Sequence, residues 1–379
     1  MVAGIRVCLI SRLFRGADIF QGGILRRLTK IGAASAVLVL ALAGCAQDDE
    51  NPGSDAAADM CDGGGDGPTV GLAYDVGGRG DQSFNDSAAV GMEKAVEELD
   101  ATCTEAEAQD GEAESAREDR LRQLAESGHN PIVGIGFAYS DAANIVAPDF
   151  PEVSFAVVDG FDPDEEPNDN VAYLGFAENE GSFLVGVAAA LTTEADHVGF
   201  VGGVNNALIQ KFEAGYAAGV EAVDPNIKVD VQYIEESDLA GFNDPAGGKA
   251  AATGMYDAGA DVVYHASGGS GSGVFDAAVD AGEGMWAIGV DSDQYLTASE
   301  EAQPHILTSM LKRVDTATFD MIQSVADGEP LVSYQVYNLE ADGVGYSTSG
   351  DFLSEDTIAQ IDEFAEQIKS GEITVPDAP

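Results

Sequence analysis

The chain has 379 residues, with 17 Lys and Arg against 67 Asp and Glu, and a formal net charge of −50 at pH 7. So acidic a chain is not expected to bind nucleic acid, because phosphate recognition needs a basic footprint. A hydrophobic fraction of 45% excludes disorder along the whole chain, and the length suits one large domain or two α/β lobes. The acid excess predicts salty surroundings, where screening weakens self-repulsion.

The N-terminal residues predict an exported chain. Three basic residues at positions 26–30 precede an apolar run, residues 31–43, that is too short to span a bilayer comfortably. The run leads into Leu-Ala-Gly-Cys, which ends at Cys45 and resembles a lipobox. Residues 1–44 are therefore predicted to be a lipoprotein signal peptide, with lipid on Cys45 anchoring the protein at the extracytoplasmic face of the cell membrane. A plain signal peptide with an incidental Cys is the alternative.

The next segment, residues 45–67, is acidic and Gly-rich and has no periodic apolar face, so it is predicted to be a flexible tether. Once the signal is removed and Cys45 is lipidated, Cys61 and Cys103 remain. An even pair in an oxidising compartment is a candidate disulfide. Two free thiols are the alternative.

From position 69 onward, short apolar runs alternate with amphipathic helices, a pattern typical of parallel sheets covered on both faces. The first series is predicted at Thr69–Tyr74, a helix from Phe84, a helix over 112–126, Pro131–Gly136, a helix from Ser140, Val153–Val158 and Val171–Leu174. The second is predicted at His197–Val201, 210–223, Lys228–Ile234, 245–258, Asp261–His265, Ser272–Ala281 and Trp286–Val290, with a terminal helix over 355–370. Ser83 and Asp86 give the helix at Phe84 a start that is similar to a capping box.

Two such series imply two doubly wound lobes, whose ligands would sit at the carboxyl ends of the strands. The residues there are carboxylates, amides, glycines and aromatics: Asp75, Phe84, Asn85, 137–141, Asp159, 202–206, 242–244, 267–273 and 291–293. Carboxylates accept hydrogen bonds from sugar hydroxyls or ring N–H groups, and aromatic faces sandwich a planar ring. Glycines let backbone amides approach. The pattern favours recognition of a flat polar molecule.

The same positions do not predict an enzyme. They hold no Ser-His-Asp set, no Cys nucleophile and no cluster of His ligands. The Gly-rich run 267–273 has the place of a dinucleotide fingerprint, but Val274 stands where a third Gly or Ala is needed. The Gly-Gly-Lys at 247–249 lacks the first Gly and the hydroxyl residue of a P-loop. No cofactor and no metal ion are expected.

Several motifs together resemble the basic membrane protein family, the purine nucleoside receptor-like lipoproteins. The resemblance covers roughly residues 68–350 and is carried, in order, by 75–86 (DVGGRGDQSFND), 136–141 (GFAYSD), 201–203 (VGG), 211–216 (KFEAGY), 242–249 (FNDPAGGK), 266–271 (ASGGSG), 289–294 (GVDSDQ) and 308–315 (TSMLKRVD). It implies an α/β type I periplasmic-binding-protein fold, with two doubly wound lobes joined by a three-segment hinge. Lobe 1 is expected to comprise residues 68–176 and 311–330, and lobe 2 residues 177–310 and 331–379.

The resemblance also implies a function: a monomeric receptor that delivers a purine-type nucleoside to the permease and ATPase of an ABC importer. Phe84 and Phe242 would stack on the base, and Asp141 would hold a base edge. The remaining site residues would be Asp75, Asn85 and Asp291 for base or ribose, Gly268 and Gly269 for backbone contacts, and Lys312 for a ribose hydroxyl or an acidic neighbour. Whether Asp291 or Asp293 is the direct ligand stays open.

Three other functions remain open on the sequence. The same fold could bind a sugar or another small polar molecule, although two Phe side chains favour a planar base. A sensor subunit would hand its closed form to a membrane kinase instead of a transporter. A nucleoside hydrolase would need a nucleophile or an Asp-rich metal site, which only Asp291-Ser-Asp293 faintly suggests.

Overall fold

The computed structural model describes residues 61, 64–109, 111–161 and 168–379, all of which belong to one compact unit, Asn51–Pro379. The predicted signal peptide, Cys45 and most of the predicted tether lie outside the described residues. Within the described ranges, no helix combines the length and apolar character that a bilayer crossing requires.

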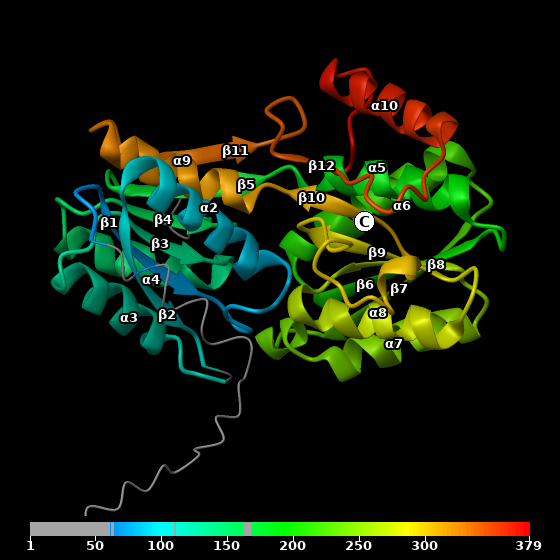
Figure 1. Cartoon of the computed structure of the whole chain (residues 1–379), viewed down its shortest axis with the longest axis horizontal. Helices are drawn as coiled ribbons and strands as arrows, with labels where there is room; N and C mark the ends of the chain where they lie inside the picture. The colour runs from blue at the N-terminus through cyan, green and yellow to red at the C-terminus, as the bar shows by residue number, and fades with distance from the viewer. Residues whose placement is uncertain (1–60, 62–63, 110, 162–167) are drawn as a thin grey trace, which may run out of the picture. The chain divides into compact units, whose positions relative to one another are not determined.

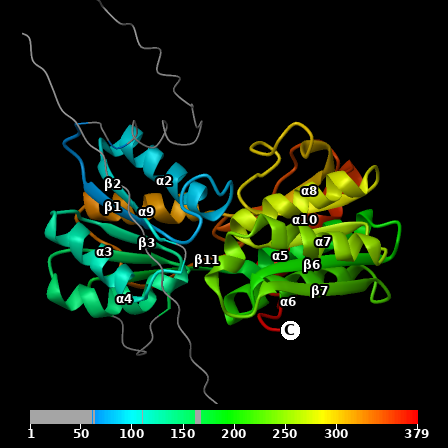
Figure 2. The same cartoon turned by 90° about the horizontal axis from the view of Figure 1, so that it is seen from below.

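The first sheet is wholly parallel and carries two pairs of helices. Its order is β11 (Ser333–Tyr337), β5 (Val171–Phe176), β4 (Phe155–Val158), β3 (Ile132–Ile135), β1 (Thr69–Tyr74) and β2 (Thr102–Glu107). α2 (Phe84–Leu99) packs beside α9 (Val314–Ala326), and α3 (Ser115–Glu126) packs beside α4 (Ser140–Val146). The two pairs cover opposite faces of the sheet (Figure 2), which explains why its central strands are apolar along their whole length.

The second sheet repeats this architecture. Its order is β12 (Val344–Tyr346), β10 (Ile306–Lys312), β9 (Trp286–Asp291), β8 (Val262–Ala266), β6 (His197–Val204) and β7 (Lys228–Glu235), and only β12 runs antiparallel. α5 (Glu178–Thr192) packs on α6 (Ala207–Val223), and α7 (Pro245–Asp257) packs on α8 (Gly271–Ala281), with the strands between the pairs (Figure 1). The predicted α/β class with two doubly wound lobes is therefore confirmed.

The chain passes between the two sheets three times, after β5, after β10 and after β11. One lobe boundary differs from the expectation, because β11 lies in the first sheet although residues 331–379 were expected in lobe 2. The reason is its pairing: Ser333–Tyr337 runs parallel to Ala172–Phe176, and the rings of Tyr337 and Phe176 stack with centroids 5.3 Å apart. β10, which ends at Lys312, lies in the second sheet and leads directly into α9 on the first.

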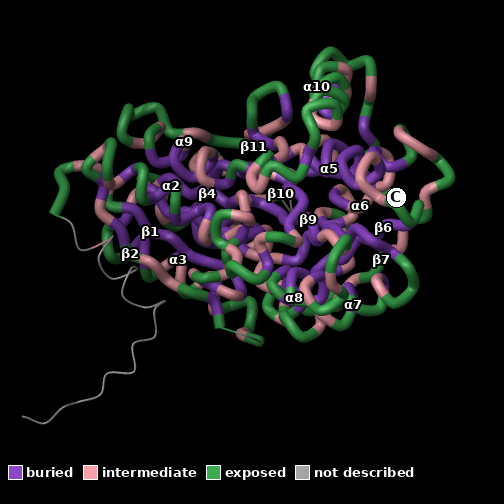
Figure 3. The backbone as a smooth tube through the Cα atoms, turned by 45° about the vertical axis from the view of Figure 1, so that its right-hand side comes forward, coloured by how far each residue is buried: buried purple, intermediate pink, exposed green. Residues whose placement is uncertain are grey.

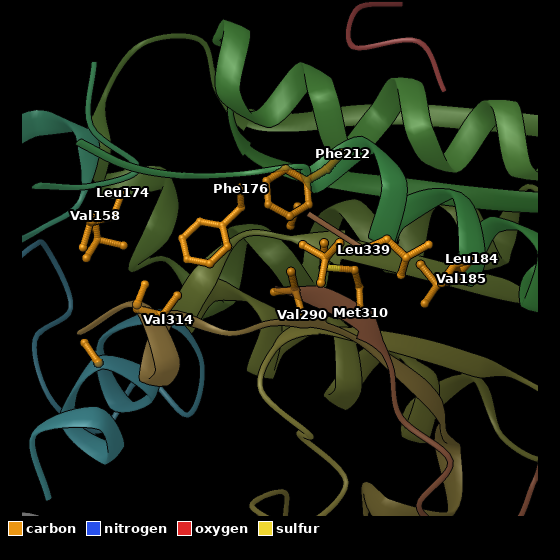
Figure 4. Close-up of a cluster of buried hydrophobic side chains, with 14 of the residues drawn as sticks. Val158, Leu174, Phe176, Leu184, Val185, Phe212, Val290, Met310, Val314 and Leu339 are labelled. Carbon is orange, nitrogen blue, oxygen red and sulfur yellow. The ribbon is translucent and has the colours of Figure 1, made fainter. Parts of the chain in front are cut away.

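The apolar core continues across these passages. Val158 and Leu174 of the first sheet belong to the same buried cluster as Val290 and Met310 of the second, with Phe176 and Phe212 between them (Figure 4). Purple, buried segments accordingly run through both sheets in Figure 3, whereas the outer turns of the helices are exposed. This shared core therefore supports the strands of both sheets where the chain crosses from one sheet to the other.

The terminal helix α10 (Glu355–Lys369) packs on the second lobe. It buries Ile361, Ala365 and Ile368, and the ring of Phe364 meets that of Phe183 in α5 edge-on, with centroids 5.6 Å apart. Near the other end of the described chain, Cys61 is disulfide-bonded to Cys103 of β2, with a Cα–Cα distance of 4.7 Å.

Candidate functional site

A single cavity brings together residues that follow strands of both sheets. The first lobe contributes Asp75, Val76, Asp81, Phe84, Asn85, Gly136, Phe137 and Asp159. The second lobe contributes Leu208, Ile209, Phe212, Phe242, Ala266, Ser267, Gly268, Val290, Asp291 and Lys312. These positions lie at the carboxyl ends of the strands and at the first turns of the helices that follow, where ligands bind in open α/β sheets.

Seven of the predicted site residues line this cavity: Asp75, Phe84, Asn85, Phe242, Gly268, Asp291 and Lys312. Asp141 and Gly269 do not. Asp141 is the second residue of α4, one helical turn beyond the cavity-lining Phe137. Gly269, like Gly268, lies near the carbonyl of Phe242.

Asp75 follows β1 and is buried. Its Oδ1 accepts a hydrogen bond from Val76 N at 2.8 Å and lies 3.6 Å from Nη2 of Arg117 in α3. Burial raises the pKa of Asp75, against the opposing effects of the Val76 N–H and the Arg117 charge. Its other oxygen, Oδ2, accepts no hydrogen bond from the described residues.

Asn85 is held in place by its neighbours. Its Oδ1 accepts from Asp75 N at 3.3 Å, and its Nδ2 donates to Asp81 Oδ2 at 3.1 Å. Asp81 also accepts from the backbone N–H groups of Ser83, Asn85 and Asp86. Asp81 therefore supplies the side-chain acceptor at the start of α2, and Ser83 makes no side-chain cap there, contrary to the expected capping box.

Asp291 closes the cavity from the second lobe. It ends β9 with a φ of +65° and is buried. Burial raises its pKa, although the charge of Lys312 and the Ser83 hydroxyl act in the opposite direction. Asp293, the alternative that the sequence left open, does not line the cavity and instead accepts a 2.6 Å hydrogen bond from Ser349.

Lys312 is 2% exposed, and its ammonium lies among carboxylates. Nζ donates to Asp159 Oδ2 at 2.6 Å and lies 3.8 Å from Glu178 Oε1. Glu178 Oε2 in turn accepts from Lys211 at 3.1 Å. Burial opposes the charge on Lys312, but Asp159, Glu178 and Asp291 together raise its pKa. Of the two partners expected for Lys312, the structure contains the acidic neighbour.

Aromatic side chains line both sides of the cavity. The ring of Phe84 comes from the first lobe, and Lys312 Nζ lies 5.0 Å from its centroid, within cation–π range. Phe242, the last residue of a short 3₁₀ turn (Leu239–Phe242), packs so closely on Gly203 that a Cβ there would lie 2.5 Å from the ring. The glycine of the Val-Gly-Gly motif therefore makes room for Phe242.

Three carboxylates in the cavity each leave one oxygen without a hydrogen bond from the described residues: Asp75 Oδ2, Asp159 Oδ1 and Asp291 Oδ1. Buried polar atoms are almost always paired in folded proteins. Of these three oxygens, Asp159 Oδ1 is itself buried, and its lack of a partner favours a ligand that brings a hydrogen-bond donor.

Phe137, Asp159 and Ser267 were expected at strand ends but were not included in the ligand-binding set, and all three line the cavity. The sequence missed other lining residues. Leu208, Ile209 and Phe212 lie in the first turns of α6, which begins at Ala207 rather than at 210, because Asn206 Oδ1 caps Ile209 N at 3.0 Å. Their side chains are apolar, and the sequence alone does not distinguish apolar residues that line a cavity from those that pack in the core.

Comparison with known proteins agrees with this geometry. Residues 69–378 match the family of ABC transporter substrate-binding proteins described as PnrA-like. A CD4+ T-cell-stimulating antigen of Listeria innocua serovar 6a is 37% identical, over 90% of this chain and 95% of the relative. The ABC transporter nucleoside-binding protein BmpA of Lactococcus lactis subsp. cremoris is 32% identical, over 93% of this chain and 99% of the relative.

A solved structure supports the same fold. An ABC transporter solute-binding protein from Aeropyrum pernix K1 superimposes with a TM-score of 0.70 at 28% identity, covering 82% of this chain and 94% of that one. The expected type I periplasmic-binding-protein fold and the expected family are both confirmed. The chain belongs to the PnrA-like family of ABC transporter substrate-binding proteins.

Proposed function

We propose that this substrate-binding protein takes up a purine-type nucleoside in the cavity and delivers it to the permease of an ABC importer. The observation that carries the proposal is one cavity lined by three carboxylates, Asp75, Asp159 and Asp291, together with two Phe side chains. A nucleoside has the matching chemistry, because its base offers flat faces and its ribose offers hydroxyl donors.

The charge of the cavity supports an uncharged ligand. Lys312 is engaged by Asp159, and Arg117 lies behind Asp75, so neither cation is available to balance a phosphate. Asp291 adds a further negative charge on the second lobe. A phosphorylated nucleoside would bring a second anion next to these carboxylates, and like charges at this range repel strongly in a low-dielectric site.

The same acceptors should make the cavity bind a nucleoside more tightly than its free base or its free ribose. A free base would leave the acceptors that meet the ribose unpaired, and each unpaired buried polar group costs about 1–3 kcal/mol. We therefore expect adenine to bind at least about tenfold more weakly than adenosine. Ribose alone would lose the stacking between Phe84 and Phe242.

Calorimetric titration tests the proposal. The chain from Ala46 onward, which keeps both Cys61 and Cys103, is unfolded and refolded to remove any carried ligand, and is then titrated in high salt. The ligands are guanosine, inosine, adenosine, cytidine, adenine and ribose. Binding of a purine nucleoside at one site per chain supports the proposal when Phe84→Ala or Phe242→Ala weakens it and Phe352→Ala, at the surface, does not. Heat with ribose alone, or with none of these ligands, would refute the nucleoside assignment and leave a receptor for another small molecule.

Anchoring and delivery complete the proposal. Lipid on Cys45 would hold a monomeric receptor at the extracytoplasmic face of the membrane, within reach of the permease and its ATPase. Mass spectrometry of the purified protein would show the lipid, which Cys45→Ser removes. Nucleoside uptake by membrane vesicles that contain the permease and ATPase should require the receptor. A response of a membrane kinase without uptake would identify a sensor subunit instead. The ligand is expected to leave chemically unchanged, so release of free base on incubation would contradict the non-enzymatic role.

A further inference from the structure

Gln294 lies behind the cavity wall and is 2% exposed. Its backbone N–H donates to Ser309 Oγ at 3.1 Å, and its Oε1 accepts from Val290 N at 2.8 Å. Gly289 allows this approach, because a Cβ at that position would lie 2.7 Å from Gln294 Oε1. The second lobe alone therefore fixes the position of this side chain.

The hydrogen bonds also fix which way its amide points. Val290 N can only donate, so the oxygen of the Gln294 amide must face it. The amide nitrogen then faces the backbone carbonyl of Gln82, which can only accept, at 2.9 Å. Because Oε1 is an acceptor, His265 Nε2, 3.1 Å away, must carry its hydrogen.

Gln82 belongs to the other lobe, in the loop between β1 and α2. Its φ of +53° is unusual for a residue other than Gly, and its carbonyl also accepts from Ser292 Oγ at 3.2 Å. Phe84, two residues further on, lines the cavity. The bond from Gln294 thus holds the backbone that carries one of the aromatic walls.

We infer that Gln294 is a positioning residue for ligand retention. It does not line the cavity, but its amide N–H ties down the Gln82 carbonyl and thereby keeps Phe84 over the cavity. When the lobes separate, this bond breaks while the bonds within the second lobe stay. The Gln82–Gln294 bond therefore favours the closed state and slows ligand release. The inference rests on the proposed function only for the choice of guanosine as the probe.

Gln294→Glu tests the inference, because it keeps the acceptor that faces Val290 and replaces the donor with an oxygen. At about pH 8 the charged carboxylate should repel the Gln82 carbonyl and raise the guanosine dissociation rate at least about tenfold, or 1.4 kcal/mol, with little change in the association rate. At about pH 5 the protonated carboxyl can donate again, and the dissociation rate should return to within about threefold of the wild-type value at the same pH. The other titratable groups near this position are His265, Asp291, Asp293 and Asp86, so the wild type is measured at both pH values.

Gln303→Glu is the matched control. Gln303 Nε2 also donates to a backbone carbonyl, that of Ala298 at 3.3 Å, but both residues belong to the second lobe. This variant should leave the dissociation rate unchanged at both pH values. Equal dissociation rates for the two variants would overturn the inference, as would a uniform loss of thermal stability without any effect of pH on release.

Two further measurements keep the test decisive. Ser292→Asp places a carboxylate next to the same Gln82 carbonyl from a partly exposed position and should raise the dissociation rate about threefold, even if Gln294→Glu does not fold. If the wild type binds no nucleoside, the proposed function fails separately. Amide hydrogen exchange of residues 82–86 in the ligand-free protein then decides: faster exchange in Gln294→Glu than in Gln303→Glu supports the inference, and equal exchange rejects it.

Discussion

Ser83 and Asp291 are joined by a 2.6 Å hydrogen bond although they lie 208 positions apart in the chain. The Ser83 hydroxyl comes from the loop before α2, and the Asp291 carboxylate ends β9 of the other sheet. The bond therefore connects the carboxyl ends of the two sheets at the rim of the cavity. The second oxygen of Asp291 has no hydrogen-bond partner among the described residues.

The Ser83 hydroxyl is expected to set the pH range of binding. It lowers the pKa of Asp291, which burial raises, so Ser83→Ala should raise that pKa further. A protonated Asp291 loses acceptor capacity for the ligand, and the affinity for guanosine should then begin to fall at a higher pH than in the wild type. Titrations between about pH 8 and pH 5 measure the midpoint. Ser83→Thr keeps the hydroxyl and should follow the wild type; a midpoint that is the same in Ser83→Ala would contradict the role.

Removing the Lys312 charge is expected to destabilise the fold. Lys312→Met leaves the buried Asp159 carboxylate without its cation and leaves Glu178 with Lys211 alone. Breaking a buried pair in this way costs about 3–5 kcal/mol, measurable by urea unfolding of the ligand-free protein. Adding Asp159→Asn should recover part of the loss. Lys249→Met, which breaks the exposed pair with Asp280, should change the unfolding free energy by less than about 1 kcal/mol.

His265 is expected to lower stability in acid. Burial lowers its pKa to about 4 from an ordinary value of 6.5, so the unfolded chain binds a proton that the folded chain excludes. This contribution is complete above about pH 6.5 and is lost as the pH falls to about 4, for a total near 3 kcal/mol. The difference in unfolding free energy between the wild type and His265→Gln should shrink or reverse by this amount over that range. If the difference in unfolding free energy did not change with pH, burial would not prevent the protonation of His265.

Salt is expected to stabilise the protein. With 67 acidic and 17 basic residues, the folded chain concentrates negative charge that repels itself. Raising KCl from about 0.1 M to 1 M shortens the screening length from about 10 Å to 3 Å and should raise the urea midpoint. Sucrose at equal osmolality stabilises only through exclusion from the surface and serves as the control. A midpoint that rises no more in KCl than in sucrose would exclude screening as the cause.

The sequence predicted most of the central strands because their burial repeats in a local pattern. Thr69–Tyr74 is β1 residue for residue, since a fully buried parallel strand reads as an apolar run. β2 (Thr102–Glu107) was not assigned, because an edge strand with alternating polar residues lacks that run. β11 pairs with a strand more than a hundred residues earlier, and local patterns contain no information on such a pairing.

The candidate site was predictable where position after a strand was enough. Asp75 and Asp291 follow this rule and line the cavity. Ser83 looked like a helix cap, yet Asp81 supplies the acceptor and frees the Ser83 hydroxyl for Asp291. This change of hydrogen-bond partner depends on a tertiary contact between the lobes. The burial of Glu178 beneath Lys312 likewise depends on the packing of α5, which its sequence neighbours do not reveal.

The Cys61–Cys103 disulfide determines where mechanical tension enters the folded body. A pull on the chain upstream of Cys61 passes through a covalent bond to β2, at the edge of the first sheet, and not through the backbone hydrogen bonds of β1. A receptor held from that side would keep its first lobe stationary while the second lobe swings.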